Sequence, residues 1–354
     1  MERLNPEMKK LLDHAIDRKA SDLHLTVGLG PTLRIDGKLL PVEGGEVLTA
    51  EETEKLGTSI MTDEEAESLK HRKEIDFSFG YKDMRFRTNV FYQKGNISVA
   101  LRLITYQIRT LQELGLPPIL EKFTTHSQGL VIITGPTGHG KSTTLAALID
   151  LINQSQSKHI ITIEDPIEYV FNHRKSMISQ REIGSDTNSF SRALRASLRE
   201  DPDVVLIGEM RDLETIEAAL TIAETGHLVL TTLHTNSAAQ TTDRMIDVFP
   251  PHQQQQVRLQ LAAVLLGVVS QRLIPRTSGG RIVATEIMVA NSAVRNIIRE
   301  GKTHQLQNTI QTSASEGMIS LDKVLSELVS GGEITLDDAL TWAVDQKAFK
   351  MMVY

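Results

Sequence analysis

The sequence contains no cysteine. Disulfide bonds, thiolate zinc sites and a cysteine nucleophile are therefore excluded, and the chain suits a reducing compartment. A basic surplus is also missing, because 38 Lys and Arg residues stand against 45 Asp and Glu, a formal net charge of −7. A protein that grips nucleic acid through its phosphates usually carries such a surplus, so we expect no nucleic-acid partner.

Long apolar runs are absent as well. The longest covers residues 261–269, far short of the roughly 20 residues that span a bilayer, so we expect no transmembrane segment and interpret this run as a buried helix. Residues 1–7 are charged where a signal peptide would turn apolar, which favours a cytoplasmic protein. A chain of 354 residues is long enough for about two domains.

The first third of the chain predicts a small α+β unit. Apolar residues recur at helical spacing over residues 4–16, and hydroxyl caps at Thr49 and Thr62 predict two short helices. Period-two patterns predict strands over residues 22–27, 33–39, 75–81, 86–91 and 99–103, with a hairpin turn at Asp36-Gly37. We therefore expect a mostly antiparallel sheet with helices on one face, in a domain over residues 1–104 that residues 105–118 link to the rest.

Arginines alternate with the apolar residues of the last two expected strands. The apolar side chains fix a buried face, so Arg85, Arg87 and Arg102 must point away from it. An anion could lie against them. The alternative is that these arginines are solvated or paired with Glu74 or Asp83.

A phosphate-binding pattern comes next. Residues 129–134 predict a buried strand of a parallel sheet, and the sequence then reads G-x-x-x-x-G-K-S before a predicted helix. In this pattern glycines let backbone N–H groups surround phosphate oxygens, the lysine reaches the β- and γ-phosphates, and the serine hydroxyl binds Mg²⁺. The predicted ATP-binding residues are Gly135, Pro136, Thr137, Gly138, His139, Gly140, Lys141, Ser142 and Thr143.

Two glutamates end or follow further apolar strands. Residues 160–163 lead into Glu164, and residues 204–207 lead into Gly208 and Glu209, which resembles a Walker B segment. Hydrolysis of a phosphoanhydride requires Mg²⁺ and a carboxylate that positions or activates the attacking water. Glu164 and Glu209 could divide those roles. The alternative is that both acids cap the helices that follow.

Histidines stand at both ends of a fourth expected strand, at positions 227 and 234. His227 and His234 could each sense the γ-phosphate, bridge to another subunit or be structural. Their spacing does not suit a helical metal site, and no cysteine is present to assist. Strands that alternate with helices after a phosphate loop predict a parallel α/β sheet.

These segments together resemble the bacterial secretion ATPases. Residues 135–142, 161–168 (an aspartate box), 204–212 and 225–236 (a histidine box) occur in the order found in that superfamily. Residues 20–25 and 198–203 are also similar, and residues 293–302 resemble a segment of the ATPases that retract type IV pili. The resemblance implies a hexameric motor that hydrolyses MgATP to drive pilus retraction and twitching motility. It also implies a PAS-like N-terminal domain and a RecA-like domain over residues 119–354, with C-terminal helices from about residue 291.

The resemblance also assigns roles to single residues. It places Arg87 and Arg102 as fingers close to bound nucleotide, and a guanidinium at the developing charge contributes about 10³-fold or more in rate. It makes Glu164 the residue that activates water. It assigns Glu209, together with Ser142, to binding of Mg²⁺, directly or through water. The reverse assignment of the two glutamates stays open.

The resemblance further implies a homohexamer at the cytoplasmic face of the inner membrane, where it acts on the pilus platform protein, PilC in this family. Pilus assembly and type II secretion ATPases typically carry a four-cysteine zinc module, which this chain lacks, so retraction is favoured. His139 departs from the serine common in the family's phosphate loop. We expect binding to survive because that position contributes mainly its backbone N–H, although an imidazole near phosphates can alter affinity or pH response.

The last third of the chain predicts helices over residues 253–269, 292–300, 320–330 and 336–346. Arg295 and Arg299 lie four residues apart on one helix face, which is either a partner contact or a solvated face.

Two other functions stay open. A nucleic-acid translocase is compatible with a RecA-like ring, but the acidic balance and the lack of a long Lys/Arg run argue against it. A nucleotide-sensing regulator would bind ATP without turnover, and the presence of both glutamates favours turnover.

Overall fold

The computed structural model describes residues 4–35, 37–82, 84–104 and 107–353. Asp36 of the expected hairpin turn, Asp83 and the first two residues of the expected linker lie outside the described residues. The chain forms two compact units, which are Met1–Gln107 with Glu168–Val170, and Ile108–Ile167 with Phe171–Tyr354.

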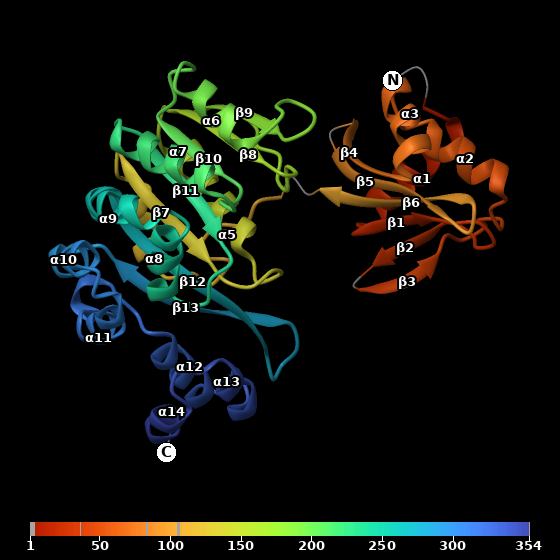
Figure 1. The fold of residues 1–354 in the computed structure, drawn as a ribbon. Coiled ribbons are helices and arrows are strands. Elements are labelled where there is room, and N and C mark those ends of the chain that lie inside the picture. The colour runs from red at the N-terminus through yellow and green to blue at the C-terminus, as the bar shows by residue number, and fades with distance from the viewer. Residues whose placement is uncertain (1–3, 36, 83, 105–106, 354) are drawn as a thin grey trace. The chain divides into compact units, whose positions relative to one another are not determined.

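The first unit is built on a six-stranded antiparallel sheet in the order β3-β2-β1-β6-β5-β4 (Figure 1). Its strands are β1 (Asp22–Leu25), β2 (Thr32–Ile35), β3 (Lys38–Pro41), β4 (Glu74–Tyr81), β5 (Met84–Gln93) and β6 (Asn96–Ile104). Helices α1 (Pro6–Asp17), α2 (Ala50–Thr58) and α3 (Asp63–Arg72) pack on one face of this sheet (Figure 1). The expected antiparallel sheet with helices on one face is therefore confirmed.

The two hydroxyl caps in this unit form as predicted. The Thr49 hydroxyl accepts a hydrogen bond from the backbone N–H of Glu52, whose carboxylate accepts one from the Thr49 N–H in return. Thr62 and Glu65 make the same reciprocal pair. Each cap satisfies two N–H groups that a helix start leaves without partners, so α2 and α3 begin where the sequence indicates.

The second unit is built on a seven-stranded sheet in the order β13-β12-β7-β11-β10-β8-β9, parallel except for the edge strand β13. Its strands are β7 (Gly129–Thr134), β8 (His159–Glu164), β9 (Met177–Glu182), β10 (Val204–Ile207), β11 (Leu228–Leu233), β12 (Leu265–Pro275) and β13 (Arg281–Val289). Buried strands of this kind carry apolar residues on both faces, which explains the continuous apolar runs.

Helices cover both faces of this second sheet. They are α4 (Ile119–Phe123), α5 (Lys141–Ser155), α6 (Phe190–Ser197), α7 (Leu213–Glu224), α8 (Ala238–Asp247), α9 (Pro251–Val264), α10 (Ser292–Glu300), α11 (Leu306–Thr312), α12 (Leu321–Ser330), α13 (Leu336–Trp342) and α14 (Gln346–Val353), with 3₁₀ turns at Thr303–Gln305 and Ala314–Glu316.

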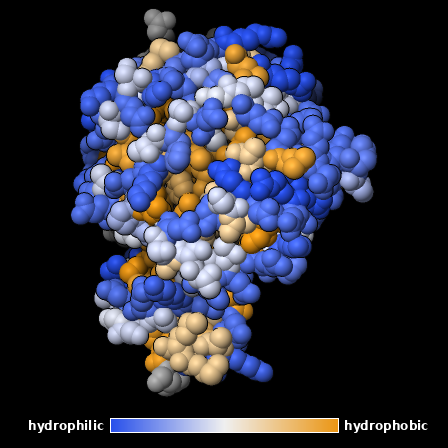
Figure 2. Space-filling view, turned by 90° about the vertical axis from the view of Figure 1, so that its left-hand side faces the viewer, coloured by the Kyte–Doolittle hydropathy of each residue, from blue (hydrophilic) through white to orange (hydrophobic). Residues whose placement is uncertain are grey.

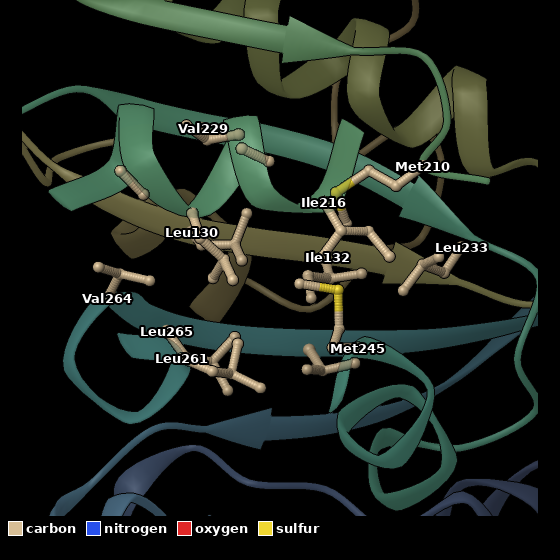
Figure 3. Packing of buried hydrophobic residues seen from close by; sticks show 14 of the residues in the cluster. Leu130, Ile132, Met210, Ile216, Val229, Leu233, Met245, Leu261, Val264 and Leu265 are labelled. Carbon is tan, nitrogen blue, oxygen red and sulfur yellow. The ribbon is translucent and has the colours of Figure 1, made fainter. Parts of the chain in front are cut away.

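The largest core lies between the sheet and helices α7, α8 and α9. Leu130 and Ile132 of β7 point toward Ile216, Met245 and Leu261 of those helices (Figure 3). Their neighbours along β7 alternate to the opposite face, which α5 covers. The expected parallel α/β sheet is confirmed.

The predicted helix over residues 253–269 is wrong over its last five residues. Helix α9 ends at Val264, and residues 265–269 continue as strand β12. Most of the apolar run is buried, with Ala263 exposed and Leu266 half-buried, and a largely buried run shows neither a clear helical nor a clear strand periodicity. β-Branched Val268 and Val269 suit the strand that forms.

None of the helices in the described part of the chain is both long and apolar enough to cross a membrane.

The face of the molecule in Figure 2 is mostly hydrophilic, with hydrophobic residues between the polar ones. Some hydrophobic side chains also reach the surface near the C-terminus, where Met351 is 79% exposed. Scattered exposed residues of this kind are usual in folded proteins.

Candidate active site

The second sheet brings the predicted catalytic segments together because its central strands are parallel. The carboxyl ends of β7, β11, β10 and β8 lie at one edge, which is where ligands bind in open α/β sheets (Figure 1). The phosphate loop follows β7, His234 follows β11, Glu209 follows β10, and Glu164 is the last residue of β8.

The phosphate loop joins β7 directly to α5, as predicted. Lys141 is the first residue of the helix and is only 7% exposed. Its ammonium donates hydrogen bonds to the carbonyl oxygens of Gly135 (2.8 Å) and Pro136 (3.0 Å). Ser142 and Thr143 lie half-buried in the first turn of α5, where backbone N–H groups and the helix dipole favour an anion.

Two loop glycines stand where no other residue fits. Gly135 has a φ of 143°, and a Cβ there would lie 2.4 Å from the backbone oxygen of Gln271. Gly140 has a φ of 83°, and a Cβ there would lie 2.8 Å from the Gln271 side-chain nitrogen. Both the left-handed backbone and the close approach of β12 therefore require glycine.

His234 connects the phosphate loop to Glu209. Its Nδ1 lies 3.4 Å from Nζ of Lys141, and its Nε2 lies 3.1 Å from a carboxylate oxygen of Glu209. Because an ammonium only donates, Nδ1 acts as the acceptor, and Nε2 carries the proton that it donates to Glu209. Thr137 adds a hydroxyl 3.5 Å from Nδ1, and Arg211 forms an ion pair with Glu209. The His234 imidazole thus links the lysine of the phosphate loop to a strand-end carboxylate.

Glu164 lies beside the Glu209 segment. Its carboxylate is largely buried and accepts hydrogen bonds from the Thr162 hydroxyl (2.6 Å) and, at 3.4 Å, from Gln180. The N–H of Gly208 donates to the carbonyl of Ile163 on the adjacent strand, and a Cβ at Gly208 would lie 3.4 Å from Cα of Glu164. The structure therefore places both glutamates on neighbouring strands at the edge that carries the phosphate loop.

His227 is not part of this group. It precedes β11, and its carbonyl accepts from the N–H of Gly129 at the start of β7. Its ring lies near the carbonyl of Ile222 (3.0 Å) and the Thr225 hydroxyl (3.2 Å). Parallel strands put their first residues at the edge opposite their last, so His227 and the phosphate loop lie at opposite edges of the sheet.

His139 turns its imidazole away from the loop's interior. Its Nδ1 accepts from the backbone N–H of Leu273 (2.9 Å), and its ring packs edge-on against Trp342, with centroids 5.2 Å apart. Burial, helped by the charges of Arg272, Lys141 and Arg281, lowers the pKa of His139. The preceding loop residue is Gly138, whose carbonyl oxygen accepts a hydrogen bond from Arg281 at 3.4 Å.

Arg87 and Arg102 lie in the first unit, directly opposite each other on β5 and β6. Both are exposed on the sheet face away from the helices, and Asp22 of β1 pairs with Arg102 in the same cross-strand row. The Arg102 Nε donates to the Asp22 carboxylate at 3.0 Å, and Arg34 of β2 approaches its other oxygen at 3.6 Å. The expectation that these arginines point away from the buried face is confirmed.

Gln271 contacts the phosphate loop but was not predicted from the sequence. Its buried side chain donates to the carbonyl of His139 (2.7 Å) and accepts from the hydroxyl of Thr144 (2.7 Å), so β12 holds the loop on both sides of Lys141. The neighbouring Arg272 donates to the carbonyl of Asn236 at 2.7 Å. Three consecutive polar residues, 270–272, directly after the predicted helix over residues 253–269 were the available signal.

Arg295 is half-buried and bonded within the chain rather than solvated. Its guanidinium donates to the carbonyl oxygens of Ala262 (2.5 Å), Ala263 (2.6 Å), Leu265 (2.8 Å) and Ala290 (2.9 Å). The last carbonyls of α9 would otherwise lack helical partners. Arg295 therefore caps α9.

A phosphate loop, a strand-end carboxylate pair and a linking histidine on a parallel α/β sheet define a P-loop ATPase. The chain belongs to the Type II/IV secretion system protein family, whose model matches residues 2–339.

Individual relatives narrow this class. The chain is 46% identical over 339 residues to the type IV pilus retraction ATPase PilT of Pseudomonas aeruginosa, a match that covers 94% of this chain and 97% of that protein. It is 46% identical over 311 residues to a twitching motility protein of Neisseria gonorrhoeae, covering 87% and 83%. The crystal structure of the pilus retraction motor PilT with bound ADP matches with a TM-score of 0.91 and 48% identity over 97% of this chain and 98% of that one. The expected resemblance to the secretion ATPases, and among them to those that retract type IV pili, is confirmed.

Proposed function

We propose that the chain is a motor ATPase that hydrolyses MgATP to retract type IV pili and so drives twitching motility. The proposed hydrolysis rests mainly on one observation, the two contacts that link Lys141 through His234 to Glu209. It puts the His234 imidazole within hydrogen-bonding distance of both the Lys141 ammonium and the Glu209 carboxylate. The names of the relatives at 46% identity support the pilus as the target.

The residues divide the work of hydrolysis in this proposal. Lys141 and the N–H groups at the start of α5 bind the β- and γ-phosphates, and the Ser142 hydroxyl and Glu209 fit Mg²⁺ held with the nucleotide. Mg²⁺ would neutralise charge on the phosphates. Glu164 orients the attacking water, and Thr162 holds its carboxylate by a short hydrogen bond. His234 is placed to respond to the γ-phosphate because it contacts both Lys141 and Glu209.

Arg87 and Arg102 are proposed as fingers that another subunit of a homohexamer delivers to this site. Their exposure on an open sheet face supports a contact with an anion, and Asp22 would hold Arg102 in an extended position. Closure of one subunit's PAS-like first unit over its neighbour's phosphate loop would then couple cleavage to movement.

The motor would act from the cytoplasmic face of the inner membrane on a pilus platform protein of the PilC type. No nucleic acid enters this proposal. The net charge of −7 offers no general attraction for phosphate backbones.

ATPase assays of purified variants test the chemistry. Lys141→Ala should abolish nucleotide binding, and Glu164→Gln should bind ATP but hydrolyse it about 10²–10⁴-fold more slowly, the usual loss when a general base is removed. Glu217→Gln, an exposed glutamate on α7, is the matched control and should keep full activity. Wild-type turnover in Glu164→Gln would remove its proposed role, and DNA-stimulated hydrolysis would favour a translocase instead.

A further inference from the structure

The only tryptophan of the chain lies against the phosphate loop. Trp342 is the last residue of α13, and its ring meets the His139 ring at 72° with centroids 5.2 Å apart. The guanidinium carbon of Arg272 lies 5.2 Å from the centroid of the same tryptophan ring. An edge-on aromatic pair and a cation–π contact each stabilise such an arrangement beyond the apolar area they bury.

His139 is held from two directions, so a shift of its ring moves the loop. Its side chain accepts a hydrogen bond from the backbone N–H of Leu273, and its backbone carbonyl accepts one from the side chain of Gln271. His139 immediately precedes Gly140, whose carbonyl accepts from the N–H of Thr144 in the first turn of α5. The tryptophan contact therefore acts on the part of the loop that leads into Lys141.

The other side of Trp342 is anchored in the C-terminal helices. The buried Asp322 of α12 accepts hydrogen bonds from the N–H groups of Val344 (2.8 Å) and Asp345 (3.3 Å), which fixes the chain just after Trp342. Leu325 of α12 and Phe349 of α14 pack in one apolar cluster with Ile274 of β12. The helices and the phosphate loop thus rest on the same strand.

We propose that Trp342 is a positioning residue for the phosphate loop, through which the packing of α12, α13 and α14 sets nucleotide affinity. The inference rests on the proposed nucleotide site and adds its regulation. By thermodynamic linkage the effect is reciprocal: nucleotide binding changes the packing of these helices by the same free energy with which the helices change nucleotide affinity.

Tryptophan fluorescence gives a direct test, because a single tryptophan reports on one place. MgADP should change the emission of the wild-type protein, and calorimetry on the same samples should give a matching Kd. His139→Ser, which removes the same ring contact from the other side, should still bind MgADP by calorimetry, about fivefold to tenfold more weakly, and lose most of the emission change. Unchanged wild-type emission at MgADP concentrations that saturate the calorimetric signal would overturn the inference. Absence of calorimetric binding would overturn the nucleotide site itself, and this inference with it.

Affinity measurements add a second test. Trp342→Ala should weaken MgADP binding about fivefold to tenfold, the effect of one lost contact of ordinary strength, while Trp342→Phe should stay within about twofold of wild type. Val344→Ala, a change at an exposed apolar position beside the tryptophan, is the matched control and should bind as wild type does. Equal affinity in wild type, Trp342→Ala and Trp342→Phe would refute the positioning role. If Trp342→Ala unfolds, His139→Ser takes its place, and wild-type affinity in that variant would refute the positioning role.

Discussion

Gln271 shows how one buried amide can serve a loop that is distant in the chain. It donates to the carbonyl of His139 and accepts from Thr144, and its backbone oxygen approaches Gly135 so closely that a side chain there is excluded. A buried amide with both functions paired is rigid, because flipping it would set its carbonyl oxygen against the carbonyl oxygen of His139, two acceptors without a proton between them. The loop's conformation is therefore specified by β12 as much as by its own glycines.

Replacing this amide by an apolar side chain of similar volume should be costly. Gln271→Met leaves the Thr144 hydroxyl and the His139 carbonyl without these partners, so we expect a loss of about 1–3 kcal/mol in the free energy of unfolding. Urea unfolding measures it. Gln255→Met, on the exposed side of α9, is the control and should stay within about 0.5 kcal/mol of wild type. Equal stability of the two variants would contradict the proposed clamp.

His139 gives the stability of the second unit a pH dependence. Burial first, then the charges of Arg272, Lys141 and Arg281, lower its pKa below the ordinary 6.5, so the folded protein holds the ring neutral with Nδ1 as acceptor. The unfolded chain takes up the proton at higher pH than the folded chain. Stability from this group is therefore complete above the unfolded pKa and is lost as the pH falls through the folded one.

The His139→Ser variant isolates that contribution. Between pH of about 7.5 and about 5.5 the wild type should lose more unfolding free energy than His139→Ser loses, because only the wild type protonates this ring on unfolding. Urea midpoints at the two pH values provide the comparison, and the other histidines cancel because both proteins carry them. Parallel pH profiles would show that His139 titrates alike in the folded and unfolded chain.

Among the secondary-structure elements, α9 depends on a cap from another helix. Arg295 of α10 reaches back to the carbonyls of Ala262 and Ala263 at the end of α9, at the point where the chain turns into β12. The cap allows a helix to end and a strand to begin within one apolar run. Sequence periodicity cannot show this boundary, because buried apolar residues continue across it, among them Ala262, Val264 and Leu265.

Removing the cap should destabilise the protein. Arg295→Ala should lower the free energy of unfolding by about 2–3 kcal/mol, since several carbonyls lose a charged donor. Arg295→Lys should recover only part of that, because an ammonium cannot reproduce the planar fork of a guanidinium. The control is Arg299→Ala on the exposed part of α10, which should be nearly neutral in the same thermal or urea unfolding experiment. Faster hydrogen exchange near Val264 in Arg295→Ala alone would locate the effect.

At the scale of the whole molecule, the proposed catalytic groups are shared between the two compact units. Lys141, Glu164, Glu209 and His234 belong to the second unit, and Arg87 and Arg102 to the first. If one subunit supplies the arginines to its neighbour, a mixture of two inactive variants should behave differently from either variant alone.

Chains with complementary defects should restore each other. Arg102→Ala and Lys141→Ala chains should each be nearly inactive alone, and co-assembled they should regain a measurable part of wild-type ATPase activity. Recovery requires that an intact arginine on one chain meet an intact loop on another. Separate refolding of each variant before mixing, with no exchange of subunits, is the control. No recovery in co-assembled rings would place the arginine and the loop of one site on the same chain.

Site residues in one local motif or at the ends of parallel strands could be predicted from the sequence, whereas contacts between distant segments could not. The phosphate loop lies between β7 and α5 within a few residues, and parallel strand ends meet at one edge, so Glu164, Glu209 and His234 could be placed. The same rule puts His227 at the far edge, because it precedes its strand. Contacts of Gln271 and Trp342 with the loop join residues more than a hundred positions apart and follow no local pattern.

Successive side chains of strand β12 alternate between two sets of bonding partners. Ser270 and Arg272 bond to the carbonyl of Asn236, while Gln271 between them bonds to His139 and Thr144. Deleting or inserting one residue ahead of position 270 would exchange the two sets and aim each at the wrong side of the sheet. The spacing of this strand is thus intolerant of length variation, whereas in the exposed turn over residues 276–280 a change of length would displace no buried side chain.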